Sequence, residues 1–204
     1  IANHLTEAGV VAVKADSPYK TIEELVAAAK EKGNLKASTN GNKASNHTAA
    51  QLLAKSAGFK YKAIPYGGTA DQLLALRQGE VDFTCAKVAD VAKLVKGDKP
   101  ELRVLAVFNT KRDPELPNVP TLGEKGLYPE WYGSARALVA PKGTKPEVIQ
   151  YYVEAFKKTM QDPAVIEAHK KAGMALDFKD NKELGDLIKA QDKFARDVVN
   201  DLYK

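Results

Sequence analysis

Short apolar stretches alternate with amphipathic helical stretches along this chain, and that alternation restricts its fold more than any other feature. Thr21 and Glu24 form a capping box at the start of the first helical stretch, and Gly33 is placed to end it. Short strands alternating with helices favour a mostly parallel sheet in an α/β architecture. In the first half, strands are expected at residues 10–13, 35–38, 61–64, 81–85 and 103–107, with helices at 22–32, 45–58, 69–78 and 88–95.

The second half of the chain continues the α/β pattern after an interruption. Four prolines between residues 114 and 129 exclude long regular structure there, because each removes a donor and restricts the residue before it. A strand is expected at 135–139, followed by helices opening at Pro146 and Pro163. A short strand near 176–178 and one long terminal helix complete the prediction.

The composition excludes several classes of function. The chain has 204 residues and a formal net charge of +5, and its basic residues are spread rather than clustered. Aromatic residues make up 7% and do not interleave with the basic ones, so no nucleic-acid partner is indicated. No apolar run is long enough to cross a bilayer, so no direct membrane insertion is expected.

Nothing in the sequence indicates an enzyme. His4, His47 and His169 lack metal-ligand spacing, and paired cysteines and nucleophile or phosphate-binding motifs are missing from the sequence. Cys85, the single cysteine, ends a predicted strand and is interpreted as a buried, inert thiol. We therefore predict no catalytic residue, no metal and no cofactor.

Two strand-to-helix junctions made of small and polar residues are the strongest indication of a binding site. Each leads into an apolar helix pattern, and a helix N-terminus carries unpaired N–H groups and partial positive charge that favour a carboxylate or phosphate. Gly67 and Gly68 would let a ligand oxygen approach the backbone. Ser45 and Thr69 are expected to serve as cap hydroxyls and as donors to a carboxylate. The candidate ligand-binding residues are Thr39, Asn40, Gly41, Asn42, Lys43, Ser45 and His47, then Tyr66, Gly67, Gly68 and Thr69, and finally Ala86 and Lys87 after the strand at 81–85.

Each candidate has an alternative interpretation. The first loop could be a plain turn and helix cap, and His47 could be a packing or helix-surface histidine. Lys43 and Lys87 could point to solvent. Arg136 lies in the strand at 135–139, where a charge would cost free energy if the strand were interior and the charge unpaired. Arg136 could clamp a carboxylate in a bidentate manner, or it could lie at an exposed edge or in a structural salt bridge.

Five sequence blocks, in order along nearly the whole chain, carry a resemblance to a known family. They are Thr-Asn-Gly-Asn at 39–42 with Ser45 to His47, Pro-Tyr-Gly-Gly at 65–68, Gly-Glu-Val-Asp at 79–82, Leu-Ala-Val at 105–107 with Lys111-Arg112 and Leu-Pro-Asn-Val-Pro-Thr at 116–121, and Ala-Pro-Lys-Gly-Thr at 140–144. On these blocks the chain resembles the solute receptors of tripartite tricarboxylate transporters, the TctC or Bug family.

The resemblance implies a two-lobed fold of the type II periplasmic-binding-protein kind, with the ligand in the cleft between the lobes. On that mapping, residues 14–133 form the second lobe, and residues 1–13 and 134–204 form parts of the first. The family's opening segment, with its Pro-Pro-Gly-Gly loop, is not in this sequence, so the first lobe is expected to be incomplete. A periplasmic or other extracytoplasmic location is implied, with a leader in the precursor, a monomeric state and transporter subunits in the membrane as partners.

Two departures from the family pattern bear on the ligand. Gly67 replaces the family's lysine, which removes one cationic contact. Lys87 follows Ala86, where family members commonly carry an aspartate that could receive an ammonium group. This favours a di- or tricarboxylate over an amino acid, although an amino acid or an aromatic carboxylate stays an alternative. The effector-sensing domain of a transcription regulator, or an enzyme on the same scaffold, would be alternatives of a different class.

Overall fold

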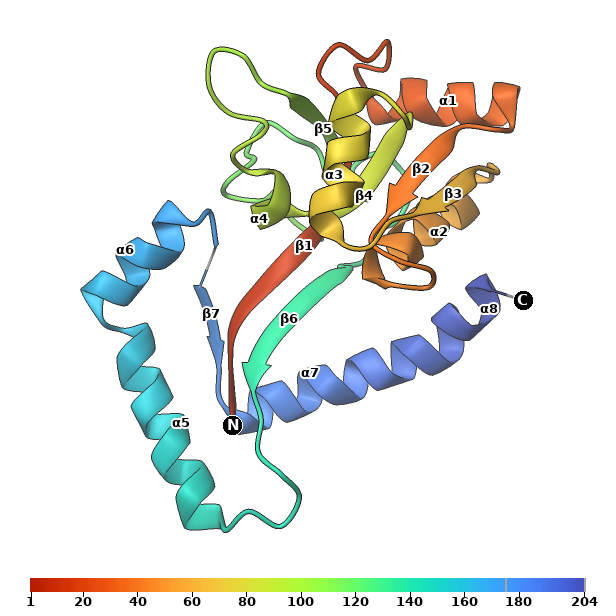
Figure 1. Cartoon of the computed structure of the whole chain (residues 1–204). Coiled ribbons are helices and arrows are strands. Elements are labelled where there is room, and N and C mark those ends of the chain that lie inside the picture. The colour runs from red at the N-terminus through yellow and green to blue at the C-terminus, as the bar shows by residue number, and fades with distance from the viewer. Residues whose placement is uncertain (175, 204) are drawn as a thin grey trace. The chain divides into compact units, whose positions relative to one another are not determined.

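The computed structural model describes residues 1–174 and 176–203, and the chain divides into two compact units (Figure 1). Unit 1 combines Ile1–Glu7 with Ala135–Lys204, and unit 2 is Ala8–Ser134. The chain therefore passes between the units after Glu7 and after Ser134. The lobe boundaries that the resemblance implies, after Val13 and Gly133, stay a prediction. β1 is a single long strand, Ala2–Lys14, of which the sequence pattern identified only the end.

Unit 2 is built on a sheet with the strand order β3-β2-β4-β1-β5. The remaining strands of this sheet are β2 (Lys36–Thr39), β3 (Lys62–Pro65), β4 (Phe83–Lys87) and β5 (Leu102–Phe108). β2 pairs in parallel with both β3 and β4, but β1 runs antiparallel to β4 and β5. The predicted mostly parallel sheet is therefore wrong: the α/β fold is confirmed, but its sheet is mixed, because β1 enters from unit 1 against the direction of its neighbours.

The helices of unit 2 follow the strands in the predicted order. They are α1 (Ile22–Lys32), α2 (Ser45–Ala57), α3 (Thr69–Gln78) and α4 (Val88–Val91). The capping box of Thr21 and Glu24 is present, and Gly33 ends α1 in the left-handed conformation. The helix predicted at 88–95 ends at Val91, because Leu94 bonds back to Val91 in a tighter turn.

The strand order places α2 and α3 on opposite faces of the sheet. The crossover from β2 to β3 runs one way across the sheet, and the crossover from β3 to β4 runs back the other way. Because parallel crossovers are right-handed, the two connecting helices must cover opposite faces. Figure 1 shows this arrangement, with α3 in front of the sheet and α2 behind it.

The core on the α3 side explains how β1 and β5 are fixed. Val10 and Ala12 of β1 pack in one buried cluster with Leu73 and Leu76 of α3. Apolar burial of this kind contributes about 25 cal/mol per Å² removed from water. β5 enters the same cluster through Leu102 and Val104, then through Val107, because a register shift opposite Val11 and Ala12 changes its phase.

Unit 1 contains the first residues of β1 and most of the second half of the chain. β6 (Gly133–Leu138) and β7 (Leu176–Lys179) both pair with β1. The helices are α5 (Pro146–Met160), α6 (Pro163–Lys171) and α7 (Asn181–Phe194), and the predicted long terminal helix continues through a π-helical segment, Ala195–Val199, into α8 (Asn200–Leu202).

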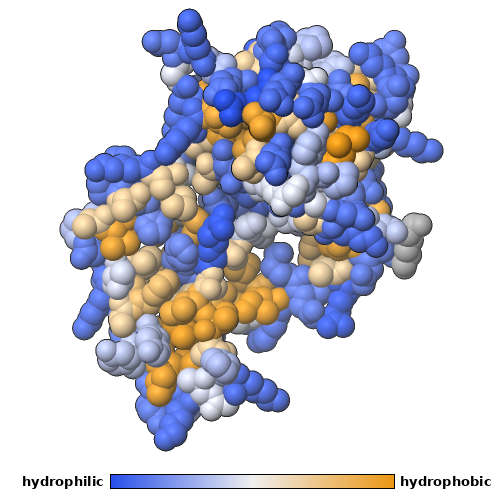
Figure 2. All heavy atoms as spheres, viewed as in Figure 1, coloured by the Kyte–Doolittle hydropathy of each residue, from blue (hydrophilic) through white to orange (hydrophobic). Residues whose placement is uncertain are grey.

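Apolar side chains gather on the surface of unit 1 around α5 (Figure 2). Val148, Tyr151 and Tyr152 of α5 are exposed, and so is Ile188 of α7. Among the described residues, no helix is long and apolar enough to cross a membrane.

Candidate functional site

Three strands of unit 2 end at the same edge of the sheet. The parallel register pairs Thr39 of β2 with Pro65 of β3, and Ser38 of β2 with Thr84 of β4. The loop before α2, the loop before α3 and the end of β4 therefore lie side by side. Because the loop after β2 leads behind the sheet and the loop after β3 leads in front of it, this edge is a topological switch point, where ligands of open α/β sheets bind.

The start of α2 is the first component of the candidate site. Its N-cap residue is Ala44, which has no side-chain acceptor to offer the first turn, and the first turn contains no acidic residue. The amide oxygen of Asn40 accepts a hydrogen bond from the backbone N–H of Asn46 at 3.3 Å. The expectation that Ser45 and Thr69 act as helix caps is wrong, because each is the first residue inside its helix. A carboxylate at the start of α2 would meet first-turn N–H groups to which Ala44 offers no side-chain acceptor, although Asn40 accepts from that of Asn46.

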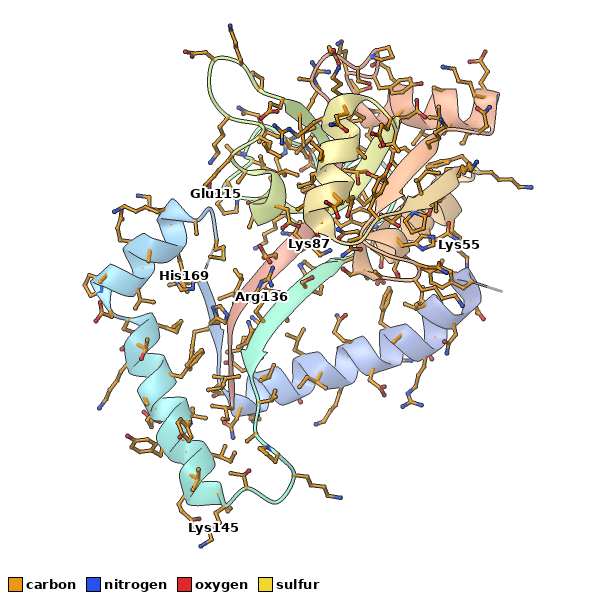
Figure 3. The ribbon with its side chains drawn as sticks, viewed as in Figure 1. Lys55, Lys87, Glu115, Arg136, Lys145 and His169 are labelled. Carbon is orange, nitrogen blue, oxygen red and sulfur yellow. The ribbon has the colours of Figure 1, made fainter. Side chains whose placement is uncertain are left out.

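Lys87 is the second component, and it ends β4 rather than following it. Its side chain reaches the start of α2, where Nζ donates to Asn46 Oδ1 at 2.6 Å and to Ser45 Oγ at 3.3 Å (Figure 3). The residue is only 4% exposed. Burying an ammonium costs free energy unless it is hydrogen-bonded, so a buried lysine at this position suggests a functional role. The alternative that Lys87 points to solvent is not what the structure shows.

The loop between β2 and α2 is held by its own hydrogen bonds. Thr39 Oγ1 donates to the carbonyl of Gly41, and the backbone N–H of Lys43 donates to His47 Nδ1 at 2.9 Å. Gly41 and Lys43 both have positive φ angles, 131° and 57°, so the loop is tightly bent. Burial lowers the pKa of His47 below its usual value, which keeps the ring neutral and able to accept this bond. Asn42 is exposed at the tip of the loop.

The start of α3 is a weaker anion site than the start of α2. Its N-cap is Gly68, which also lacks a side-chain acceptor, but Asp71 lies in the first turn of the helix. The Asp71 carboxylate oxygen lies 3.4 Å from the position that a Cβ on Gly67 would occupy. This carboxylate already neutralises part of the positive potential at the start of α3. Tyr66 turns its hydroxyl to Glu80, at 3.0 Å.

Two predicted site residues have other roles in the structure. Ala86 is fully buried in the apolar cluster with α3 and α4, so it is not at the surface of this edge. The Arg136 guanidinium donates from Nε and Nη2 to one carboxylate oxygen of Glu7, whose side chain is 3% exposed. That is the structural salt bridge that the sequence left open, and a ligand contact by Arg136 stays a prediction.

Sequence reasoning missed three residues that shape the site. Asn46 and Gln72 are fully buried and hydrogen-bonded to each other, and the Tyr132 hydroxyl donates to the backbone carbonyl of Ser45 at 3.1 Å. One signal was available for Gln72, because it lies four residues before Leu76 and so shares the buried face of α3. Nothing in the local pattern indicated Tyr132, which follows the proline-punctuated segment.

Cys85 has the inert environment that the sequence predicted. The thiol is fully buried, and burial raises its pKa to about 12. We expect iodoacetamide at pH 8 to leave Cys85 unmodified in the folded protein and to alkylate it once urea unfolds the chain. Mass spectrometry of the two samples measures this, and rapid alkylation without urea would contradict the burial of the thiol.

Two histidines meet in unit 1 without forming a metal site. His4 Nδ1 lies 3.3 Å from His169 Nε2, and the other ring nitrogen of His169 bonds to the Val165 carbonyl at 2.9 Å. Because a carbonyl only accepts, His169 donates there from Nδ1. Burial is the largest cause of the lowered pKa of His4. Among the described residues, no group of three metal-ligating side chains occurs.

The mixed sheet, the chain passing twice between two units and a polar sheet edge of this kind together define a periplasmic solute-binding protein fold. The chain belongs to the TctC family, the receptors of the tripartite tricarboxylate transporter family, and the family model matches residues 1–202. This is a family of solute-binding receptors, not of enzymes, which confirms the resemblance found in the sequence blocks.

One curated relative and two solved structures are similar to this chain. A UPF0065 protein of Cupriavidus necator is 38% identical over 152 residues, which is 74% of this chain and 45% of the relative. A TctC solute-binding protein from Polaromonas, solved with no ligand, matches with a TM-score of 0.83 at 27% identity, over 98% of this chain and 68% of that one. An R. palustris protein solved with adipate matches with a TM-score of 0.80 at 21% identity, over 96% and 67%. The chain spans about half the length of the curated relatives it matches.

Proposed function

We propose that this protein is an extracytoplasmic receptor that binds a small di- or tricarboxylate and delivers it to the membrane subunits of a tripartite tricarboxylate-type transporter. The observation that carries the proposal is the buried ammonium of Lys87 at the start of α2, where N-cap Ala44 provides no side-chain acceptor. A cation and a helix N-terminus at one point attract a negatively charged group.

The energies are adequate for a metabolite receptor. A hydrogen bond to a charged group contributes roughly 1.5–3 kcal/mol net. Micromolar affinity needs about 8 kcal/mol. A carboxylate held by Lys87 and by backbone N–H groups of the α2 start would supply much of that before the costs of association. A second carboxylate on the same ligand would add contacts elsewhere, which favours a di- or tricarboxylate over a simple monoacid.

The polar groups at the start of α2 also bear on which ligands fit. Lys87 and the helix N–H groups are donors, and the first turn of α2 has no acidic residue to receive an ammonium group. An α-amino acid would therefore bring its cationic group to the hydrogen-bond donors at the start of α2. This supports a carboxylate without an amino group; two proteins of similar fold, each 21% identical to this chain, are solved with adipate and with malate.

Isothermal titration calorimetry of the protein with malate, adipate, citrate and glutamate tests the proposal. We expect binding of at least one of the first three acids with a dissociation constant in the micromolar range or below, and no measurable heat with glutamate. Binding of glutamate alone would overturn the proposed ligand class, and no heat with any of the four acids would count against the proposed function.

A further inference from the structure

A row of polar side chains is buried beneath the candidate site, where an apolar core would be expected. Asn46 and Gln72 are no more than 1% exposed, and Ser38 and Thr84 are fully buried. Buried polar groups cost free energy unless they are hydrogen-bonded, and a fully bonded network fixes its members in one arrangement. The row extends from the carbonyl of Cys85 through Gln72 and Asn46 to the ammonium of Lys87, and we call these four groups the polar relay.

The relay has a single direction, which is set by its first member. The Cys85 carbonyl can only accept, so the Gln72 amide nitrogen must face it, at 2.6 Å. Gln72 then presents Oε1 to Asn46, whose Nδ2 donates at 2.9 Å. This leaves Asn46 Oδ1 facing Lys87 Nζ. Reversing either amide would oppose two acceptors or two donors.

A second anchor, Thr84, also fixes Gln72 to β4. The Thr84 hydroxyl donates to the Ser38 carbonyl at 2.9 Å, so its oxygen accepts from Gln72 Nε2 and from the Ser38 hydroxyl. Both hydrogens of the Gln72 amide are thus engaged, by Thr84 and by Cys85 of β4. Because Gln72 is held in place, it holds Asn46 in place, and Asn46 in turn orients the Lys87 ammonium.

From this geometry we infer that Gln72 and Asn46 are positioning residues that hold the Lys87 ammonium at the start of α2, with Gln72 acting from a distance. The inference rests on the proposed function for its consequence, namely that the ammonium is presented to a carboxylate. Ser45 Oγ and Asn46 Oδ1, the two acceptors described for Lys87, are neutral. They orient the ammonium and bring no negative charge of their own, whereas an aspartate at position 46 would.

The test compares the wild-type protein with Gln72→Met, which fills the same space without hydrogen-bonding groups. Gln78→Met, at the exposed last residue of α3, is the matched control. The first readout needs no ligand: in ¹H–¹⁵N spectra of the ammonium group, we expect a slowly exchanging Lys87 signal in the wild type and in Gln78→Met, and its loss in Gln72→Met. The second readout is malate affinity, which we expect to fall at least fivefold in Gln72→Met only.

A second variant keeps the test decisive if Gln72→Met does not fold. In Gln72→Glu the protonated acid can donate to the Cys85 carbonyl and accept from Asn46, whereas the ionised acid can still accept from Asn46 but sets a negative charge against the Cys85 carbonyl oxygen and loses that anchor. We therefore expect the Lys87 signal to be present at pH 5 and lost at pH 8 in this variant, while in the wild type it changes little.

The outcomes separate the two proposals. An unchanged Lys87 signal and unchanged malate affinity in folded Gln72→Met, or a Gln72→Glu signal that does not depend on pH, would overturn the positioning role and leave the carboxylate site standing. A fixed Lys87 signal in a wild-type protein that binds none of the acids would instead overturn the proposed function and leave the relay intact.

Discussion

Replacing Lys87 by methionine is expected to lower the affinity for malate or adipate by about tenfold to a hundredfold. The variant removes the buried ammonium but keeps a side chain of similar length, so the sheet edge stays filled. Loss of one hydrogen bond to a charged group costs roughly 1.5–3 kcal/mol, and each 1.4 kcal/mol is a factor of ten in affinity. Calorimetry at constant pH and salt measures the change.

Lys62→Met is the matched control for this prediction, because Lys62 is exposed at the beginning of β3, away from the carboxyl edge. It removes the same charge from the same unit and is expected to leave the affinity within twofold of the wild type. Equal affinities of Lys87→Met and the wild type, with both proteins folded, would show that the ammonium does not contact the ligand.

Placing an aspartate at the start of α2 is expected to lower the affinity for malate by a comparable factor and to raise the stability of the protein. Ala44 has the extended backbone of an N-cap residue, so in Ala44→Asp the new carboxylate can accept from the first-turn N–H groups. It would stabilise the helix by about 0.5–2 kcal/mol. It would also occupy the positive site that we assign to the ligand, so we expect malate affinity to fall at least tenfold.

Thr21→Asp adds the same charge at a helix start on the opposite edge of the sheet. There α1 follows the end of β1, which runs against β4, and Thr21 already caps the helix. Malate affinity is expected to be unchanged in this control. Urea unfolding and calorimetry on the three proteins give both quantities, and a stabilised Ala44→Asp that still binds malate like the wild type would place the ligand elsewhere.

The local elements of unit 2 could be predicted from the sequence because their signals are local. Thr21 and Gly33 mark the two ends of α1, and the bounds of α3 agree with the prediction at both ends. The direction of β1 could not be predicted in this way, since it depends on the strand entering from unit 1. Strand direction is a property of the whole topology, and an alternation of strands and helices favours the parallel arrangement by default.

The candidate site was predictable only in part, for a similar reason. The small residues of the loop before α2 indicate a helix start that suits an anion, and Lys87 indicates a positive charge near that helix start. The burial of Lys87 depends on Asn46 and Gln72, which come from two helices on opposite faces of the sheet. The pairing of Arg136 with Glu7 depends on residues far apart in the chain, and no local pattern favours it over a ligand contact.

A ¹H–¹⁵N NMR titration of the protein with malate tests whether the start of α2 and Lys87 bind the carboxylate, because it reports on the backbone amides themselves. We expect the largest shifts on the amides of Ser45, Asn46 and His47, with a simultaneous change at the Lys87 ammonium. Saturable binding whose shifts leave these groups unmoved would contradict it.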